Sequence, residues 1–383
     1  MENQEKAHLS GEIKTILKKV SRTLYLSLNI LPEPVRSSMG LGYLLCRALD
    51  TVVDTPGVQA ADKLEIIFLA RGLDKPDNSA ALLKKIRSLS ALPAPQGERE
   101  LLLKFGKILS IYSSFPPEDR AVFSGLIHGV SSGLEMDVRT FPGGGPSSFA
   151  PVLSPGASEG RGPAKLLLSE AGPAAFKTAR ELELYCARTG GAPGVFWTRL
   201  YRKALRRSGR SGSTFPSENG AEMIGSALQM INILKDMAGD LRLGRCYLPQ
   251  EDLDSRNMKP AELLLPSNMG RLRDITAKWM YWALDRLDLC EAFVSAIPKS
   301  EMAMRAAVIW PVYWAMDTLE EAAHSNLLDP ADRPRVKRSR IYTTIAATPP
   351  LLLSNTAFAR GYRFRRETLI GSITGGNYEG RAI

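Results

Sequence analysis

The stretch LGYLLCRALDTVVD, residues 41–54, is apolar around most of a helical circumference but carries one polar stripe. Tyr43, Arg47, Asp50 and Asp54 follow the spacing i, i+4, i+7, i+11, which places them on one helical face. A helix that is apolar nearly all round is normally buried. The stripe is therefore expected to face an internal site, the alternative being a solvated face with an ion pair from Arg47.

A second stretch, LQMINILKDMAGD at residues 228–240, repeats this pattern. Gln229, Asn232, Asp236 and Asp240 form its polar stripe. Amide and carboxylate oxygens are the donors that Mg²⁺ prefers. Two buried acidic stripes without a cation would carry a heavy desolvation penalty. The two helices together predict a cavity in which paired aspartates hold Mg²⁺.

The rest of the chain predicts an all-α fold, because apolar residues recur at spacings of three and four through nearly every long segment. We expect one helical domain over residues 1–365. The segment 141–164 is rich in Gly, Pro and Ser, which favours a mobile loop or lid inside this domain over a domain linker. Residues 366–383 are expected to form a disordered tail. The helical patterns cover 36–54, 98–111, 118–138, 175–206, 219–241, 268–296 and 301–323.

Composition narrows the functional classes. The net charge of +10 over 383 residues indicates an anionic partner. The basic residues are dispersed without a zinc-finger spacing, so nucleic acid is not predicted. The three histidines lie far apart, which argues against a histidine metal site. Four cysteines without a CxxC motif indicate a reducing compartment, and a polar start and no bilayer-length apolar run favour a cytoplasmic protein. The basic surface would suit peripheral contact with an anionic membrane. No protein partner is predicted.

A third feature is YCARTGGAPG, residues 185–194. Tyr185 ends a helical pattern that Gly190, Gly191 and Gly194 then interrupt. Because glycine costs about 1 kcal/mol in a helix relative to alanine, three together indicate close packing or a helix break. For this segment alone, a helix–turn–helix with a structural tyrosine is the simpler interpretation.

Six pieces in order resemble the squalene/phytoene synthase family, whose members join two prenyl diphosphates head to head. The resemblance implies a single all-α, isoprenoid synthase-type bundle around a central hydrophobic cavity. It runs from about residue 21 to 340. The matching pieces are SRTL (21–24), YLLCRALDTVVD (43–54), GLEMD (133–137), YCARTGGAPG (185–194), LQMINILKDMAGD (228–240) and GRCYLP (244–249).

The resemblance also implies roles for individual residues. The two aspartate pairs would bind Mg²⁺ and, through it, the substrate diphosphates. Tyr185 matches the tyrosine proposed to assist proton removal. Further matches to substrate-contacting or polar motif positions are Arg22, Tyr43, Arg47, Gln229, Asn232 and Arg245.

The implied function is Mg²⁺-dependent condensation through a cyclopropyl diphosphate, with two farnesyl diphosphates giving squalene and NADPH supplying hydride. A phytoene or dehydrosqualene synthase without reduction is the alternative within the family. The chain departs from the family at Val53, Lys235 and Pro193, and in the length of 141–164. It keeps all four motif aspartates, which argues against a non-catalytic assembly factor. A single-substrate terpene cyclase fits the flanking motifs less well.

Overall fold

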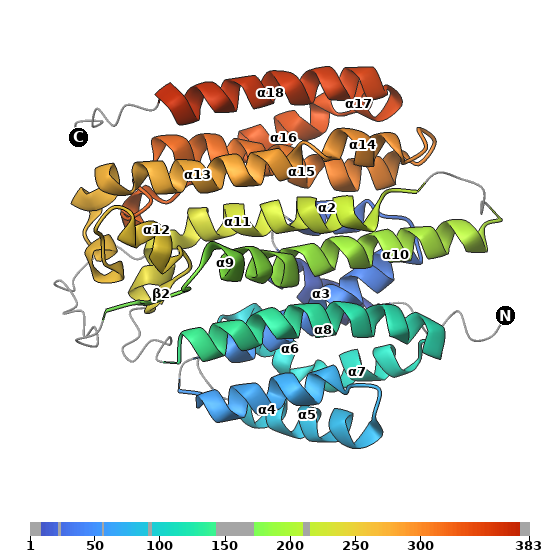
Figure 1. Ribbon diagram of the computed structural model, residues 1–383. Helices are drawn as coiled ribbons and strands as arrows, with labels where there is room; N and C mark the ends of the chain where they lie inside the picture. Colours follow the sequence, from blue (N-terminus) through green and yellow to red (C-terminus); the bar gives the residue numbers. More distant parts are fainter. Residues whose placement is uncertain are drawn as a thin grey trace.

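The computed structural model describes residues 9–21, 24–55, 57–90, 94–142, 172–209 and 215–375, and it shows helices stacked in layers (Figure 1). The predicted all-α fold is confirmed. The helices are α1 (Gly11–Ser21), α2 (Leu24–Asn29), α3 (Val35–Asp54), α4 (Ala60–Arg71), α5 (Pro76–Leu89), α6 (Gln96–Leu103), α7 (Phe105–Ser113), α8 (Pro117–Thr140), α9 (Ala179–Cys186), α10 (Ala192–Arg207), α11 (Glu218–Arg242), α12 (Gln250–Asp254), α13 (Met269–Leu287), α14 (Cys290–Ser295), α15 (Met302–His324), α16 (Arg338–Ala347), α17 (Pro349–Leu353) and α18 (Asn355–Gly375).

Helix α11 runs through the middle of the molecule, between α9–α10 on one side and α13 and α15 on the other (Figure 1). Its first turn is capped by Ser217, whose hydroxyl oxygen accepts a hydrogen bond of 2.8 Å from the Gly220 amide. Side chains on most of its circumference are buried, from Ile224 to Leu241. This burial on several sides matches the apolar pattern that surrounds the second aspartate stripe.

In the described residues, the β-sheet consists of two strands of two residues each. Strand β1 (Ala174–Ala175) pairs in parallel with β2 (Arg245–Cys246), with Ala174 opposite Arg245. The Ala174 amide donates a hydrogen bond of 3.1 Å to the Gly244 carbonyl. This pairing fixes the backbone just after α11, where Arg245 lies.

The glycine-rich segment after Tyr185 does not turn back on itself. It continues from α9 into α10 through one π-helical turn, Ala187–Gly191, so the helix–turn–helix interpretation was wrong. The glycines allow close packing on α11: a Cβ added at Gly190 would lie 2.2 Å from the Gly225 carbonyl oxygen, and one at Gly194 would lie 2.3 Å from that of Ala221. A π turn often marks a functional site.

The disordered tail predicted for residues 366–383 was placed too early in the chain, because α18 continues to Gly375. Residues 366–375 form the last turns of α18, and Leu369 and Ile373 are buried. Arg365 donates a hydrogen bond of 2.7 Å to the buried Asp317 of α15, which holds α18 on the bundle. Spaced apolar residues and arginines thus anchor a segment whose glycine and polar content had suggested disorder.

Other expectations are corrected at element boundaries. The pattern at 98–111 is divided into α6 and α7 at Lys104, and that at 268–296 is divided into α13 and α14. The pattern at 175–206 begins with β1 rather than with a helix. Of the predicted insertion, residues 143–164 lie outside the described part of the chain. Among the described residues, no helix is both long and apolar enough to cross a bilayer.

The contact between the π turn and α11 can be tested by Gly225→Ala. The added Cβ would lie 2.2 Å from the Gly190 carbonyl oxygen, and such overpacking costs about 1–3 kcal/mol. We expect a corresponding fall in the free energy of unfolding, measured with urea. Gly239→Ala on the same helix is the control, because nothing lies within 4 Å of its added Cβ. It should stabilise the protein by up to about 1 kcal/mol; equal effects of the two substitutions would contradict this packing.

Candidate active site

The two aspartate stripes face a common region at the C-terminal ends of α3 and α11, and Arg245 lies between them. Its Nη1 atom donates a hydrogen bond of 2.7 Å to Asp54 Oδ1, although Arg245 is only 7% exposed. The negative charge of Asp54 also contributes to raising the pKa of Asp240 on α11. The predicted convergence of the two helices is therefore present in the fold.

On α3, the carboxylate of Asp50 lies beside a guanidinium. Arg47 donates hydrogen bonds to Asp50 and to Glu98 of α6. Burial and the nearby charge of Asp54 nevertheless raise the pKa of Asp50 to about 6. The carboxylates of this helix are thus close enough to repel one another even with arginine present.

On α11, the two aspartates have different surroundings. Asp236 accepts a hydrogen bond from Arg333, a residue of the basic segment 333–342. The pKa of Asp240 lies well above its ordinary value, first because of burial and then because of the charge of Asp236. Ionised Asp240 is therefore costly in the absence of an added cation.

Tyr185 belongs to a buried polar cluster with Asp137 of α8 and Tyr247. The Tyr247 hydroxyl donates a hydrogen bond of 3.1 Å to Asp137 Oδ2, and the Tyr185 hydroxyl lies 3.5 Å from both of these oxygens. The two tyrosine rings stack with centroids 5.1 Å apart. Burial raises the pKa of Asp137 to about 7 and raises the pKa of Tyr185 well above its usual value. Tyr185 is accordingly a neutral phenol next to a carboxyl group that titrates near neutrality.

An apolar cavity of about 230 Å³ lies along the earlier turns of α3 and α11, before the aspartates, none of which lines it. We call it the tail cavity. Tyr43 and Cys46 line it on α3, and Gly225 and Leu228 line it on α11. Pro311 and neighbouring residues of α15 close another side. A cavity of this composition suits a hydrocarbon chain whose polar end lies among the aspartates.

The remaining predicted residues are placed as follows. The Tyr43 hydroxyl donates a hydrogen bond of 2.9 Å to the Val20 carbonyl, while its ring lines the tail cavity. Gln229 is half-buried, and the exposed Asn232 accepts a hydrogen bond of 2.9 Å from Lys235. Arg22 lies outside the described residues.

The donor set of the site suits Mg²⁺, but arginines bond to Asp50, Asp54 and Asp236 in this structure. No group of three or more His, Cys, Asp or Glu side chains in the described ranges is arranged to hold a metal ion. Asp50 and Asp54 on α3, and Asp236 and Asp240 on α11, supply oxygen ligands from two sides. Burial, and then the repulsion between neighbouring carboxylates, raises the pKa values of Asp50 and Asp240, and a divalent cation would offset both costs. These four carboxylates would hold the metal.

Sequence reasoning missed Asp137, Tyr247, Glu98 and Arg333. Asp137 lies in the matched piece GLEMD but was given no role. Gly129 and Gly133 lie on the same helical face, and the Asp137 Oδ1 atom is buried with no hydrogen-bond partner. A carboxylate on an otherwise small and apolar face was an available signal. Glu98 and Arg333 reach the site through tertiary contacts alone, for which the local pattern gives no indication.

Comparison with known proteins agrees with this geometry. The sequence profile described as squalene/phytoene synthase matches residues 17–341. The chain is 24% identical over 296 residues to a bifunctional lycopene cyclase/phytoene synthase of Phaeosphaeria nodorum, covering 77% of this chain and 43% of that protein. It is 22% identical over 347 residues to phytoene synthase 3 of Zea mays, covering 86% and 63%. The chain thus spans less than two thirds of these relatives.

Solved structures show the same fold. A ligand complex of TcSQS superposes with a TM-score of 0.66 at 17% identity, covering 95% of this chain and 98% of that one. A dehydrosqualene synthase in complex with a ligand superposes with a TM-score of 0.53 at 17% identity, covering 92% and 98%. At this identity the superpositions establish the shared all-α architecture.

The electrostatic cost of Asp240 can be measured by Asp240→Asn without divalent cations. Because its pKa is raised in the folded protein, ionisation costs stability above that pKa. The cost disappears as the pH falls toward 4, where the unfolded carboxyl also becomes protonated. We expect the variant to unfold with a free energy about 1 kcal/mol higher than the parent at pH 8 and nearly equal at pH 4.

Asp274→Asn is the matched control, because that side chain is 67% exposed on α13. It should change the free energy of unfolding by less than about 0.5 kcal/mol at either pH. A lower free energy of unfolding in Asp240→Asn at pH 8 would contradict the conclusion that ionised Asp240 destabilises the fold.

Proposed function

Because this chain belongs to the squalene/phytoene synthase family, a family of prenyltransferases, we propose that it condenses two prenyl diphosphates head to head. The observation that carries the proposal is the order of features along α3 and α11. The tail cavity lies along the earlier turns of both helices, and the motif aspartates follow near their C-terminal ends. Ligands for a cation-bound diphosphate thus come after an apolar space for its tail on the same two helices.

When bound, Mg²⁺ would neutralise the diphosphate and make it a better leaving group. Arg47, Arg245 and Arg333 already bond to the motif carboxylates. Their planar guanidinium groups can turn to diphosphate oxygens when those carboxylates take up the cation. The first substrate then loses diphosphate with the bonding electron pair, and the apolar cavity wall keeps water from the resulting allylic cation.

The double bond of the second substrate attacks this cation, and loss of a proton closes the cyclopropane ring. Tyr185 holds its own proton at neutral pH, because burial raises its pKa. The Tyr185 hydroxyl can therefore accept the substrate proton only if it gives up its own proton at the same time. The carboxyl of Asp137, 3.5 Å away with a pKa of about 7, is suited to receive it. Tyr185 and Asp137 are thus proposed to act together.

For the substrate, we favour farnesyl diphosphate and a squalene-type product. A phytoene synthase that couples two geranylgeranyl diphosphates is the second candidate, because the curated relatives include phytoene synthases. The basic segment 333–342 could bind the phosphate of NADPH, but two of its arginines already have partners within the protein. Arg333 bonds to Asp236, and Arg340 bonds to Asp317 and Glu320. Peripheral membrane contact remains a proposal supported by the net charge of +10.

The test is incubation of the purified chain with each diphosphate and Mg²⁺, with and without NADPH, followed by identification of the hydrocarbon. We expect a condensed product that EDTA abolishes. Asp50→Ala should lower diphosphate release at least about a hundredfold, as loss of transition-state charge stabilisation commonly does, with its circular dichroism unchanged.

Asp274→Asn, a carboxylate on the surface of α13, should retain activity in the same assay. Full activity of Asp50→Ala would overturn the site assignment. Diphosphate release without a condensed product would instead indicate a cyclase acting on one substrate.

A further inference from the structure

A second cavity, of about 320 Å³, lies between α8 and the α9–α10 segment. We call it the outer groove. Its rim carries His128, Arg188, Arg199 and Glu222, of which His128 and Arg199 are exposed, so it opens toward solvent. Its other lining residues are glycines or apolar side chains. None of the roles proposed above uses this groove.

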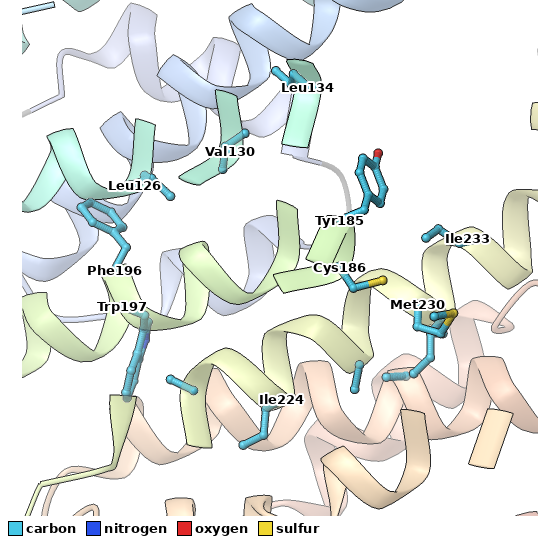
Figure 2. Packing of buried hydrophobic residues seen from close by; sticks show 14 of the residues in the cluster. Leu126, Val130, Leu134, Tyr185, Cys186, Phe196, Trp197, Ile224, Met230 and Ile233 are labelled. Carbon is cyan, nitrogen blue, oxygen red and sulfur yellow. The ribbon is translucent and has the colours of Figure 1, made fainter. Parts of the chain in front are cut away.

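Two side chains, Leu126 of α8 and Phe196 of α10, line both the outer groove and the tail cavity. They are therefore the partition between the two spaces. Figure 2 shows the Phe196 ring directed toward Leu126, whereas the neighbouring Trp197 points away from α8 toward Ile224. Both partition residues are nearly fully buried: Phe196 is 2% exposed and Leu126 is 4% exposed.

The partition lies directly against the helix that carries the first aspartate pair. A Cβ added at Gly42 would lie 2.6 Å from Phe196 Cε1 and 2.9 Å from Leu126 Cδ2. Gly42 precedes Asp50 by eight residues, which is about 12 Å along an α-helix. A prenyl tail that starts at the aspartates and follows α3 therefore reaches the Phe196 ring after about 12 Å.

We propose that Phe196, with Leu126, sets the longest prenyl tail that the tail cavity accepts. The inference rests on the proposed function and adds the residue that determines substrate length. Removing the ring would join the tail cavity to the outer groove, so that an additional isoprene unit could pass between α8 and α10. Apolar residues of the outer groove, such as Val122 and Val195, would contact that unit.

Phe123 provides a matched control. Its ring packs behind Phe196, with centroids 5.1 Å apart, and it is as deeply buried. It belongs to neither cavity lining. The same substitution at Phe123 therefore removes the same number of buried atoms next to the partition without opening it.

The experiment compares kcat/KM for geranylgeranyl and farnesyl diphosphate in the parent, Phe196→Ala and Phe123→Ala. We expect Phe196→Ala to raise the ratio of kcat/KM for the longer substrate to kcat/KM for the shorter one at least about tenfold. This is the discrimination that one methylene gives in an apolar pocket. Phe123→Ala should leave the ratio within about twofold of the parent. Where either alanine variant fails to fold, Phe196→Leu, Leu126→Ala and Phe123→Leu make the same comparison.

An unchanged ratio in folded partition variants, or an equal shift in the Phe123 variants, overturns the proposal. Affinity for the unreactive S-thiolodiphosphates of both lengths is measured in parallel by calorimetry. If the parent turns over neither substrate, the proposed function fails, while a tenfold change in the ratio of these affinities still supports the partition. Binding that is independent of tail length in all variants contradicts it.

Discussion

The ion pair between Arg245 and Asp54 is the interaction on which the rest of the site depends. Arg245 is buried, its Nη1 atom is 2.7 Å from Asp54 Oδ1 and 3.8 Å from Asp137 Oδ2, and its charge opposes the rise in the pKa of Asp240. A buried guanidinium without such partners would be strongly destabilising. The β1–β2 pairing fixes its backbone beside α11. Arg245 thereby reduces the repulsion among Asp54 of α3, Asp137 of α8 and Asp240 of α11.

Around this region, the fold combines close backbone packing with carboxylates whose ionisation is unfavourable. Gly190 and Gly225 bring the π turn and α11 into backbone contact, so that Tyr185 is held at the site end of α9. Meanwhile Asp50, Asp137 and Asp240 all have raised pKa values, chiefly through burial. A protein selected for stability alone would not gather these groups, and strongly shifted pKa values are common at functional sites. The apolar helices supply the stability that this arrangement uses.

The sequence predicted those parts of the site that lie on single helices. The stripes ending at Asp54 and Asp240 were recognisable because each interrupts an apolar helix at regular spacing. The π turn was not predictable in this way, because Gly190 and Gly191 resemble a helix break until α11 is known to pack against them. Glu98 and Arg333 arrive through tertiary contacts, and no local pattern specifies those. The end of α18 was missed although Leu369 and Ile373 carry helical spacing, because nearby glycines were given more weight.

The central claim is that α3 and α11 hold one cation-bound diphosphate between them. Calorimetric titration of Mg²⁺ in the presence of an unreactive prenyl S-thiolodiphosphate tests it most directly, using Asp50→Asn, Asp236→Asn and the double variant. We predict that each single change weakens binding at least about tenfold and that the double change adds little further, because both helices hold the same ligand. Independent, additive losses, or Mg²⁺ binding unchanged in the double variant, would contradict a shared site.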